Sequence, residues 1–316
     1  FTRYAQPSVQ DKPAVEQPSE STKPLTDEKL DIHDFSKVKD RLEKQQEYLK
    51  NDLSWEAANR WSEAAKDYGI GVETLKQEVV AILQPIVDKA DVWMAVPQNR
   101  LLNILSSGRF KSVSETHKMG LGKAVRLRKY LAPREYVEDM LFGKITDSSE
   151  RPVYGYLSDN PDGRISEWLY NSKIEDSVAA YGSVRIKLKS AIRNRTTITW
   201  GDSLDINTAD KARIVPSFIG KINAEAILGN LLRIHDSPER QVEGLGWKIP
   251  ARTAKEYKSI ADTATHDYVE AQIHKAYVDD IEEVVFSEEP DEGMVKRLNK
   301  LNIAYRVRKI PTEPWP

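Results

Sequence analysis

Within the segment at residues 182–189, strict alternation of apolar and basic residues from Val184 to Lys189 is the feature that most constrains the fold. Val184, Ile186 and Leu188 fall on one side of an extended chain, and basic side chains fall on the other. A β-strand places every second residue on the same face, which a helix cannot do. Because a lone strand is not stable in water, this segment requires partner strands and a sheet with one buried face.

More segments of the C-terminal half have strand character, with β-branched or aromatic residues in short runs. The predicted strands cover residues 151–157, 195–200, 268–274, 283–286 and 303–308. Helical periodicity is predicted between them at 222–234 and 294–301. Strands interspersed with helices in this way favour an α+β fold with a mixed β-sheet.

The N-terminal part of the chain has a different character. Residues 1–30 contain four prolines among polar residues and are expected to form a disordered linker, or a tether to another module. Apolar residues three or four apart then predict helices at 31–50, 52–66, 72–89 and 97–105. We therefore expect a helical region over residues 31–106 and an α+β domain over residues 107–316.

Composition excludes several classes of protein. The 316 residues carry a formal net charge of −2 and no cysteine, which argues against a globally basic nucleic-acid binder and excludes disulfide scaffolds and thiolate catalysis. No long uncharged apolar run is present, so we expect a soluble chain without a membrane span. The first residue is Phe1, which suggests a processed product or a fragment.

Familiar catalytic motifs are missing from the sequence. It contains no P-loop, no GxGxxG after a strand, no GxSxG and no HExxH, and its five histidines form no tight cluster with carboxylates. We therefore expect no metal site. What remains is an ordered set on the predicted strands, in which Arg151 is followed by Thr196 and Thr197 and then by Glu270.

In this order, the residues resemble the ADP-ribosyltransferase superfamily, which has an Arg, a Ser/Thr-x-Ser/Thr and a Glu on three separated strands. The resemblance covers about residues 109–310. It extends to short sequence motifs that are similar in bacterial and phage-encoded ADP-ribosyltransferase-like proteins. These motifs are Gly108-Arg-Phe-Lys111, Arg151-Pro-Val-Tyr-Gly155, Tyr181-Gly182, Gly201-Asp-Ser203 and Tyr268-Val-Glu-Ala-Gln-Ile-His274.

The resemblance implies a site for NAD. Arg151 would bind the pyrophosphate by bidentate hydrogen bonds, with Arg109 as the competing candidate. Glu270 would stabilise the positive charge that develops on the ribose when the nicotinamide leaves. Thr196 and Thr197 would orient that carboxylate, and a tyrosine would stack on the nicotinamide. The remaining cofactor-binding candidates are Tyr154, Gly155, Tyr181 and Gln272.

Two departures from the family pattern leave alternatives open. Tyr268 stands where many toxin members have Glu or Gln, two residues before the catalytic Glu. If position 272 were the catalytic one, it would hold an uncharged Gln, and the chain would be an altered or inactive member.

The resemblance implies an NAD-dependent toxin or effector domain that is secreted or delivered into a target cytoplasm. Its partners would be a protein or nucleic-acid acceptor and an immunity, antitoxin or carrier protein. The alternative is a non-catalytic structural or interaction module of a phage particle or larger toxin. A third interpretation is nucleic-acid binding through basic residues, namely Arg126, Arg128, Lys129, Arg134, Arg185 and Lys187.

Overall fold

The fold is taken from a computed structural model of the chain. It describes residues 33–52, 58–59, 61–63, 65–66, 69–118, 134–163, 181–200, 203, 215–225 and 269–308. Contacts divide the chain into residues 1–32 and a second unit, His33–Pro316. The predicted linker lies outside the described residues. The second unit runs without division across residue 106, where the sequence analysis placed a domain boundary.

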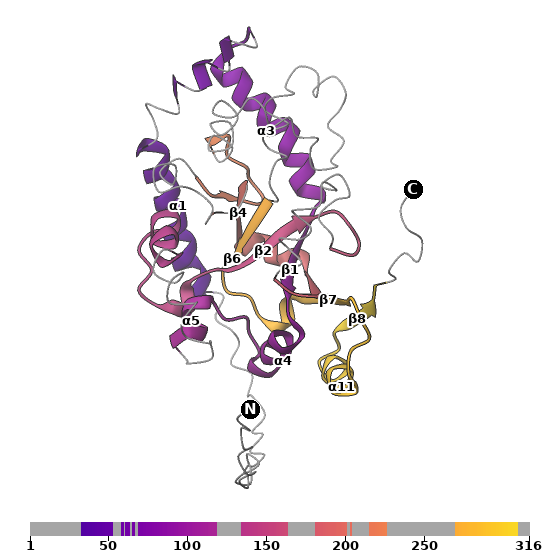
Figure 1. Ribbon diagram of the computed structural model, residues 1–316. Helices are drawn as coiled ribbons and strands as arrows, with labels where there is room; N and C mark the ends of the chain where they lie inside the picture. Colours follow the sequence, from indigo (N-terminus) through magenta and orange to yellow (C-terminus); the bar gives the residue numbers. More distant parts are fainter. Residues whose placement is uncertain are drawn as a thin grey trace, which may run out of the picture. The chain divides into compact units, whose positions relative to one another are not determined.

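An eight-stranded mixed sheet forms the centre of the second unit (Figure 1). Its strand order is β5-β4-β6-β2-β1-β3-β7-β8, and every pair is antiparallel except β7 and β8. The predicted α+β class with a mixed sheet is therefore confirmed. The strands are β1 (Asp91–Val96), β2 (Val153–Ser158), β3 (Val184–Leu188), β4 (Thr196–Trp200), β5 (Ser217–Phe218), β6 (Val269–Ile273), β7 (Ile281–Phe286) and β8 (Ala304–Val307).

Helices flank the sheet and connect its strands. The α-helices with defined bounds are α1 (His33–Asp52), α3 (Val72–Lys89), α4 (Gln98–Ser107), α5 (Val113–Lys118) and α11 (Glu292–Lys300), and residues 134–142 are also helical. Short 3-10 turns are η1 (Ser148–Glu150), η3 (Ser190–Arg195) and η5 (Val278–Asp280). The predicted helices at 72–89, 97–105 and 294–301 are confirmed to within two residues. The predicted helix at 52–66 is described only in pieces, and most of the one at 222–234 lies outside the described residues.

The prediction of a helical region over residues 31–106 was wrong at β1, which lies inside that region and pairs with both β2 and β3. Val92, Trp93 and Met94 are all buried, because helices or loops cover both faces of this central strand. A strand buried on both faces shows no alternation of apolar and polar residues. Periodicity alone could therefore not identify it.

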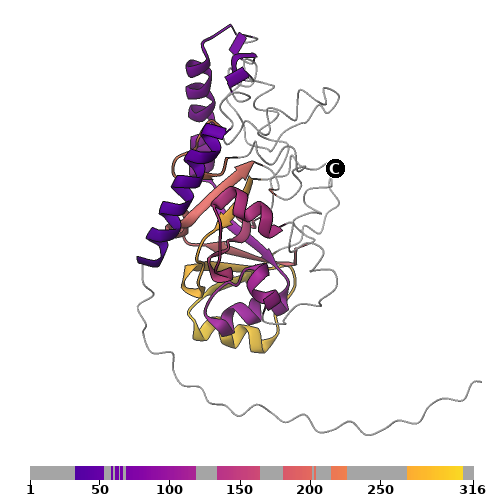
Figure 2. The same cartoon turned by 90° about the vertical axis from the view of Figure 1, so that its left-hand side faces the viewer.

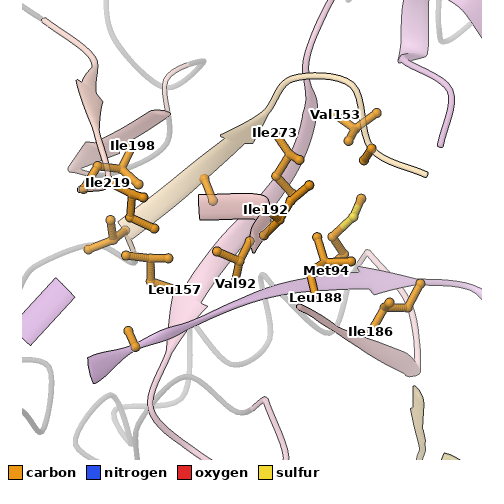
Figure 3. Packing of buried hydrophobic residues seen from close by; sticks show 14 of the residues in the cluster. Val92, Met94, Val153, Leu157, Ile186, Leu188, Ile192, Ile198, Ile219 and Ile273 are labelled. Atoms are coloured by element: carbon orange, nitrogen blue, oxygen red, sulfur yellow. The ribbon is translucent and has the colours of Figure 1, made fainter. Parts of the chain in front are cut away.

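The main hydrophobic core packs α3, α4 and α11 against one face of the sheet. Figure 3 shows side chains from β1, β2, β3, β4 and β6 meeting there, with Ile192 of η3 among them. The predicted strand is confirmed as β3, with Val184, Ile186 and Leu188 at most 1% exposed; its other face is not open to solvent throughout, since Arg185 is also buried. Helices α4 and α11 lie side by side in both Figure 1 and Figure 2. A hydrogen bond joins them, in which Arg297 Nη1 donates to Ser106 Oγ at 2.5 Å.

A second, smaller apolar cluster joins α1 to the helix at residues 134–142. Val38 and Leu42 of α1 pack there with Leu141 and Phe142. The rings of Phe142 and His274 form a T-shaped pair with centroids 5.3 Å apart, and His274 directly follows β6. This cluster thus covers the polar side of β6, opposite the main core.

Close approach of β2 to β1 depends on Gly155. A Cβ atom at this position would lie 2.3 Å from the backbone oxygen of Trp93, a distance that real Cβ contacts do not show. The two strands must therefore separate if any other residue stands here.

We expect Gly155→Ala to lower the free energy of unfolding by about 1–3 kcal/mol, the usual cost of overpacking. Urea unfolding of the purified chain measures this change. Gly220→Ala is the matched control, because a Cβ atom there meets nothing within 4 Å. Equal stability of the two variants would contradict the prediction.

His274 predicts a dependence of stability on pH. Burial, with the nearby positive charge of Arg41, lowers the pKa of His274 from 6.5 to about 3. Between these values the unfolded chain binds a proton that the folded chain does not. This contribution is complete above pH 6.5 and is lost as the pH falls towards 3, by about 1.4 kcal/mol per pH unit.

The substitution His274→Gln should remove this contribution. Urea unfolding between pH 6 and pH 4.5 should show that the free energy of unfolding falls less steeply with decreasing pH in the variant than in the wild type. The difference between the two slopes should correspond to the binding of about one proton on unfolding. Parallel slopes for the two proteins would show that the buried imidazole is not the titrating group.

Candidate functional site

A pocket opens beside the centre of the sheet, where β1 and β2 meet α4 and the helix at residues 134–142. Its walls combine one acidic, two basic and three tyrosine side chains with apolar residues of β1. The lining residues are Met94, Ala95, Val96, Arg100, Ser112, Val113, Arg134, Pro152, Val153, Tyr154, Gly155, Tyr156, Tyr181 and Glu270.

Glu270 is the acidic group of the pocket. It lies on β6, opposite Tyr156 of β2 and Thr199 of β4, and it is only 3% exposed. Its Oε1 accepts hydrogen bonds from Ser203 Oγ at 2.5 Å and from Gln272 Nε2 at 2.8 Å. A buried carboxylate with such donors is held in one orientation, because the bonds offset part of its desolvation.

Gln272 stands behind Glu270 rather than in the pocket wall. Its Nε2 donates to Thr199 Oγ1 as well as to Glu270, each at 2.8 Å, and its Oε1 accepts from Thr197 Oγ1 at 3.2 Å. These residues share one face because positions two apart on a strand point the same way. The amide thus connects the threonines of β4 to the pocket carboxylate.

Two arginines, Arg100 and Arg134, are the basic residues that line the pocket. The Arg134 guanidinium lies 4.1 Å from the ring centroid of Tyr154, within cation–π range. Burial lowers the pKa of Arg100, and the positive charge of Arg134 lowers it further. Two like charges that influence one another in this way are complementary to an anionic group placed between them.

Tyr154 contacts both a basic and an acidic side chain, those of Arg134 and Glu138. Its hydroxyl donates to Glu138 Oε1 at 2.9 Å. Burial raises the pKa of Tyr154 well above its usual value, and the negative charges of Glu138 and Glu270 add to this effect. The side chain therefore stays a neutral hydrogen-bond donor at physiological pH.

The structure brings together four of the residues predicted for the site. Glu270, Tyr154, Gly155 and Tyr181 all line the pocket, and Tyr181 is 54% exposed. The next residue, Gly182, has a φ of +146°. A Cβ atom at this position would lie 2.0 Å from the Val96 backbone, so the chain beside Tyr181 passes close to the end of β1.

The predicted phosphate-binding role of Arg151 does not fit its surroundings. Its side chain is 6% exposed and is paired with Glu138 at 2.8 Å and Asp139 at 2.9 Å. It also donates to the carbonyl oxygens of Glu135 and Ile145. With its guanidinium donors directed at these groups, Arg151 is not part of the pocket wall. Arg109, the competing candidate, pairs with Glu115 and does not line the pocket either.

The two predicted threonines are also outside the pocket. Thr196 and Thr197 are fully buried, and Thr196 Oγ1 donates to the Ile192 carbonyl at 2.8 Å. Thr197 Oγ1 contacts Gln272 and lies 3.1 Å from His274 Nε2. Only Thr197 reaches Glu270, and it does so through Gln272. Neither hydroxyl is hydrogen-bonded to Glu270 itself, as the predicted roles require.

Sequence reasoning missed Arg100 and Glu138. Arg100 lies in the predicted helix at 97–105, but the strand before this helix was not predicted. Glu138 lies in a helix that was not predicted. Neither residue therefore carried a recognisable signal. Arg134 belonged to the noted basic stretch, and Ser203 to the Gly-Asp-Ser phrase that follows β4. Arg126, Arg128 and Lys129 lie outside the described residues.

Within the described ranges, no group of three or more histidine, aspartate or glutamate side chains lies close enough to hold a metal ion. In the same part of the chain, no helix has the length and apolar character needed to cross a bilayer.

Comparison with known proteins finds phage relatives. The chain is 27% identical over 253 residues to the Gene 2 protein of Mycobacterium phage D29. This aligned stretch covers 78% of the chain and 83% of the phage protein. It is 27% identical over 213 residues to the Gene 2 protein of Mycobacterium phage L5, covering 65% and 68%. No known family profile matches the chain. The chain is thus similar to phage proteins whose names specify no activity.

Proposed function

We propose that the pocket around Glu270 binds NAD and that the protein is an NAD-dependent ADP-ribosyltransferase. The observation that carries this proposal is a buried carboxylate, held by two donors, in the same pocket as two arginines and a neutral tyrosine. These groups suit a ligand with a hydroxyl-bearing, cation-forming ribose at one end and phosphates at the other.

Glu270 supplies the electrostatic part of the reaction. When the bond between nicotinamide and ribose breaks, nicotinamide leaves with the bonding electrons and positive charge develops on the ribose. A carboxylate with little exposure interacts strongly with that charge, because water does not screen it. The acceptor then bonds to the ribose carbon and loses a proton. Ser203 and Gln272 keep the carboxylate oriented throughout.

Arg100 and Arg134 take the phosphate-binding role that the sequence analysis gave to Arg151. Guanidinium groups form charge-assisted hydrogen bonds with phosphate oxygens. A bound pyrophosphate would relieve the repulsion between these two side chains, whose effect is seen in the lowered pKa of Arg100. The face of Tyr154 or Tyr181 provides a surface on which the nicotinamide ring can stack.

We propose that the protein is a toxin or effector that modifies a protein or nucleic-acid acceptor in a target cell; the similarity to phage proteins supports the phage part of this proposal alone. An immunity or carrier protein would be its partner. The competing function is a non-catalytic structural or interaction module of a phage particle. NAD binding separates the two, since a ligand that binds only the folded state raises its apparent stability.

Replacing Glu270 by Gln should lower nicotinamide release from NAD by about 10²–10³-fold with little change in NAD affinity, because the amide keeps the shape and loses the charge. Release is measured with labelled NAD in the presence of a bacterial lysate, and transfer of label to the acceptor is followed on the same samples. Glu283→Gln is the control, since Glu283 of β7 pairs with Arg306 of β8 and does not line the pocket.

No release or label transfer above the level of Glu270→Gln, together with no NAD-induced thermal shift, would reject the enzyme and favour the structural module.

Replacing Arg134 by Ala should weaken NAD binding by about tenfold or more, the loss expected for one charge-assisted hydrogen bond. The wild-type affinity should also fall more steeply with salt than that of the variant, because a charge pair has been removed. Calorimetry at two salt concentrations measures both effects. Arg297→Ala, at an exposed position of α11, is the control. Equal affinities for the two variants would place the phosphates elsewhere.

A further inference from the structure

Arg151 connects the start of β2 to the helix at residues 134–142. It is the residue that precedes Pro152 and β2, and its guanidinium reaches Glu138 and Asp139 on that helix. It also reaches the carbonyl oxygens of Glu135 and of Ile145, beyond the helix end. One side chain thus fixes the helix and the loop after it relative to the strand that forms the pocket floor.

Glu138 extends this connection into the pocket. Its Oε2 pairs with Arg151 at 2.8 Å, and its Oε1 accepts from the Tyr154 hydroxyl at 2.9 Å. Arg134 is four residues earlier on the same helix, so the two side chains share one helix face. The rotation of the helix that lets Glu138 reach Arg151 therefore also carries Arg134 over the Tyr154 ring.

Attachment of the helix does not by itself require this ion pair. The helix already packs on α1 through the smaller apolar cluster. Arg41 Nε donates to the Phe142 carbonyl at 3.2 Å, and Gln45 Nε2 donates to the Met140 carbonyl at 2.5 Å. Buried ion pairs are also poor sources of stability, because desolvation offsets most of their attraction. What the pair adds here is a defined orientation.

We propose that Glu138 and Arg151 are positioning residues that hold Arg134 and Tyr154 in the geometry needed to bind the ligand. The link runs from the Arg151 guanidinium through the Glu138 carboxylate to the Tyr154 hydroxyl. The affinity part of this inference rests on the proposed function, whereas the geometric part does not.

The geometric part is tested with 3-fluorotyrosine incorporated at position 154 and observed by fluorine NMR. Glu138→Gln keeps the size of the side chain and removes the ion pair with Arg151. We expect it to shift the resonance, because the ring loses its charged partner and its fixed position under Arg134. Glu150→Gln is the matched control, since it breaks the Arg41–Glu150 pair without touching the pocket. It should leave the resonance in place.

The affinity part is tested with ADP-ribose, which cannot release nicotinamide, at a temperature where every variant is folded. Glu138→Gln should weaken binding by about tenfold or more, because a small displacement of binding groups is costly. Glu150→Gln should bind as the wild type does, even if its thermal stability falls by the same amount. Tyr154→Phe, which keeps the ring and the ion pair, should also weaken binding.

The double variant Glu138→Gln/Tyr154→Phe should bind no more weakly than the weaker of the two single variants, because both changes break one link. Unchanged fluorine signal and unchanged affinity in Glu138→Gln would overturn the inference. If Glu138→Gln does not fold, wild-type affinity in Tyr154→Phe would overturn it. If the wild type does not bind ADP-ribose, the proposed function fails, and the fluorine signal alone decides whether the two residues position the pocket.

Discussion

The position of β6 between β2 and β4 is the constraint on which the site depends. This register puts Glu270, Gln272 and His274 on one face of the sheet, while Val269, Ala271 and Ile273 enter the main core on the other. A slip of one residue would exchange the two sets. The carboxylate would then enter an apolar core without donors, which is far too costly. Burial of Val269, Ala271 and Ile273 therefore fixes the position of Glu270 on the opposite face of the sheet.

The arginines of this region show how neighbours decide the role of a side chain. Arg151 lies among the carboxylates of Glu135, Glu138 and Asp139, so its charge is balanced within the fold. Arg100 and Arg134 instead line the pocket; burial and then the positive charge of Arg134 lower the pKa of Arg100, while Arg134 also lies within the electrostatic reach of Glu138. The first arrangement holds elements in place, whereas the second is complementary to an anion. Residue type and strand position do not distinguish them.

Much of the fold follows from periodicity, which identified α3, α4 and α11 and the strands β2, β3, β4 and β6. It failed at β1, whose burial on both faces leaves no alternation. The lining of the pocket was predictable where it depends on strand position, as at Glu270, Tyr154 and Gly155. It was not predictable where it depends on the helix at residues 134–142. Without that helix, the acidic partners of Arg151 were unknown, and the arginine was assigned to a ligand.

The proposed reaction places two opposite requirements on the pocket, a negative charge beside the ribose and positive charge beside the phosphates. Glu270 has its orientation fixed by Ser203 and Gln272 and is almost without exposure. The side chains of Arg100 and Arg134 line the same pocket. Such preorganised groups need no rearrangement when charge develops, so they stabilise a charge-separated state more than the neutral ground state. A cation forming near the carboxylate, on a ligand whose anionic part lies at the arginines, meets both requirements together.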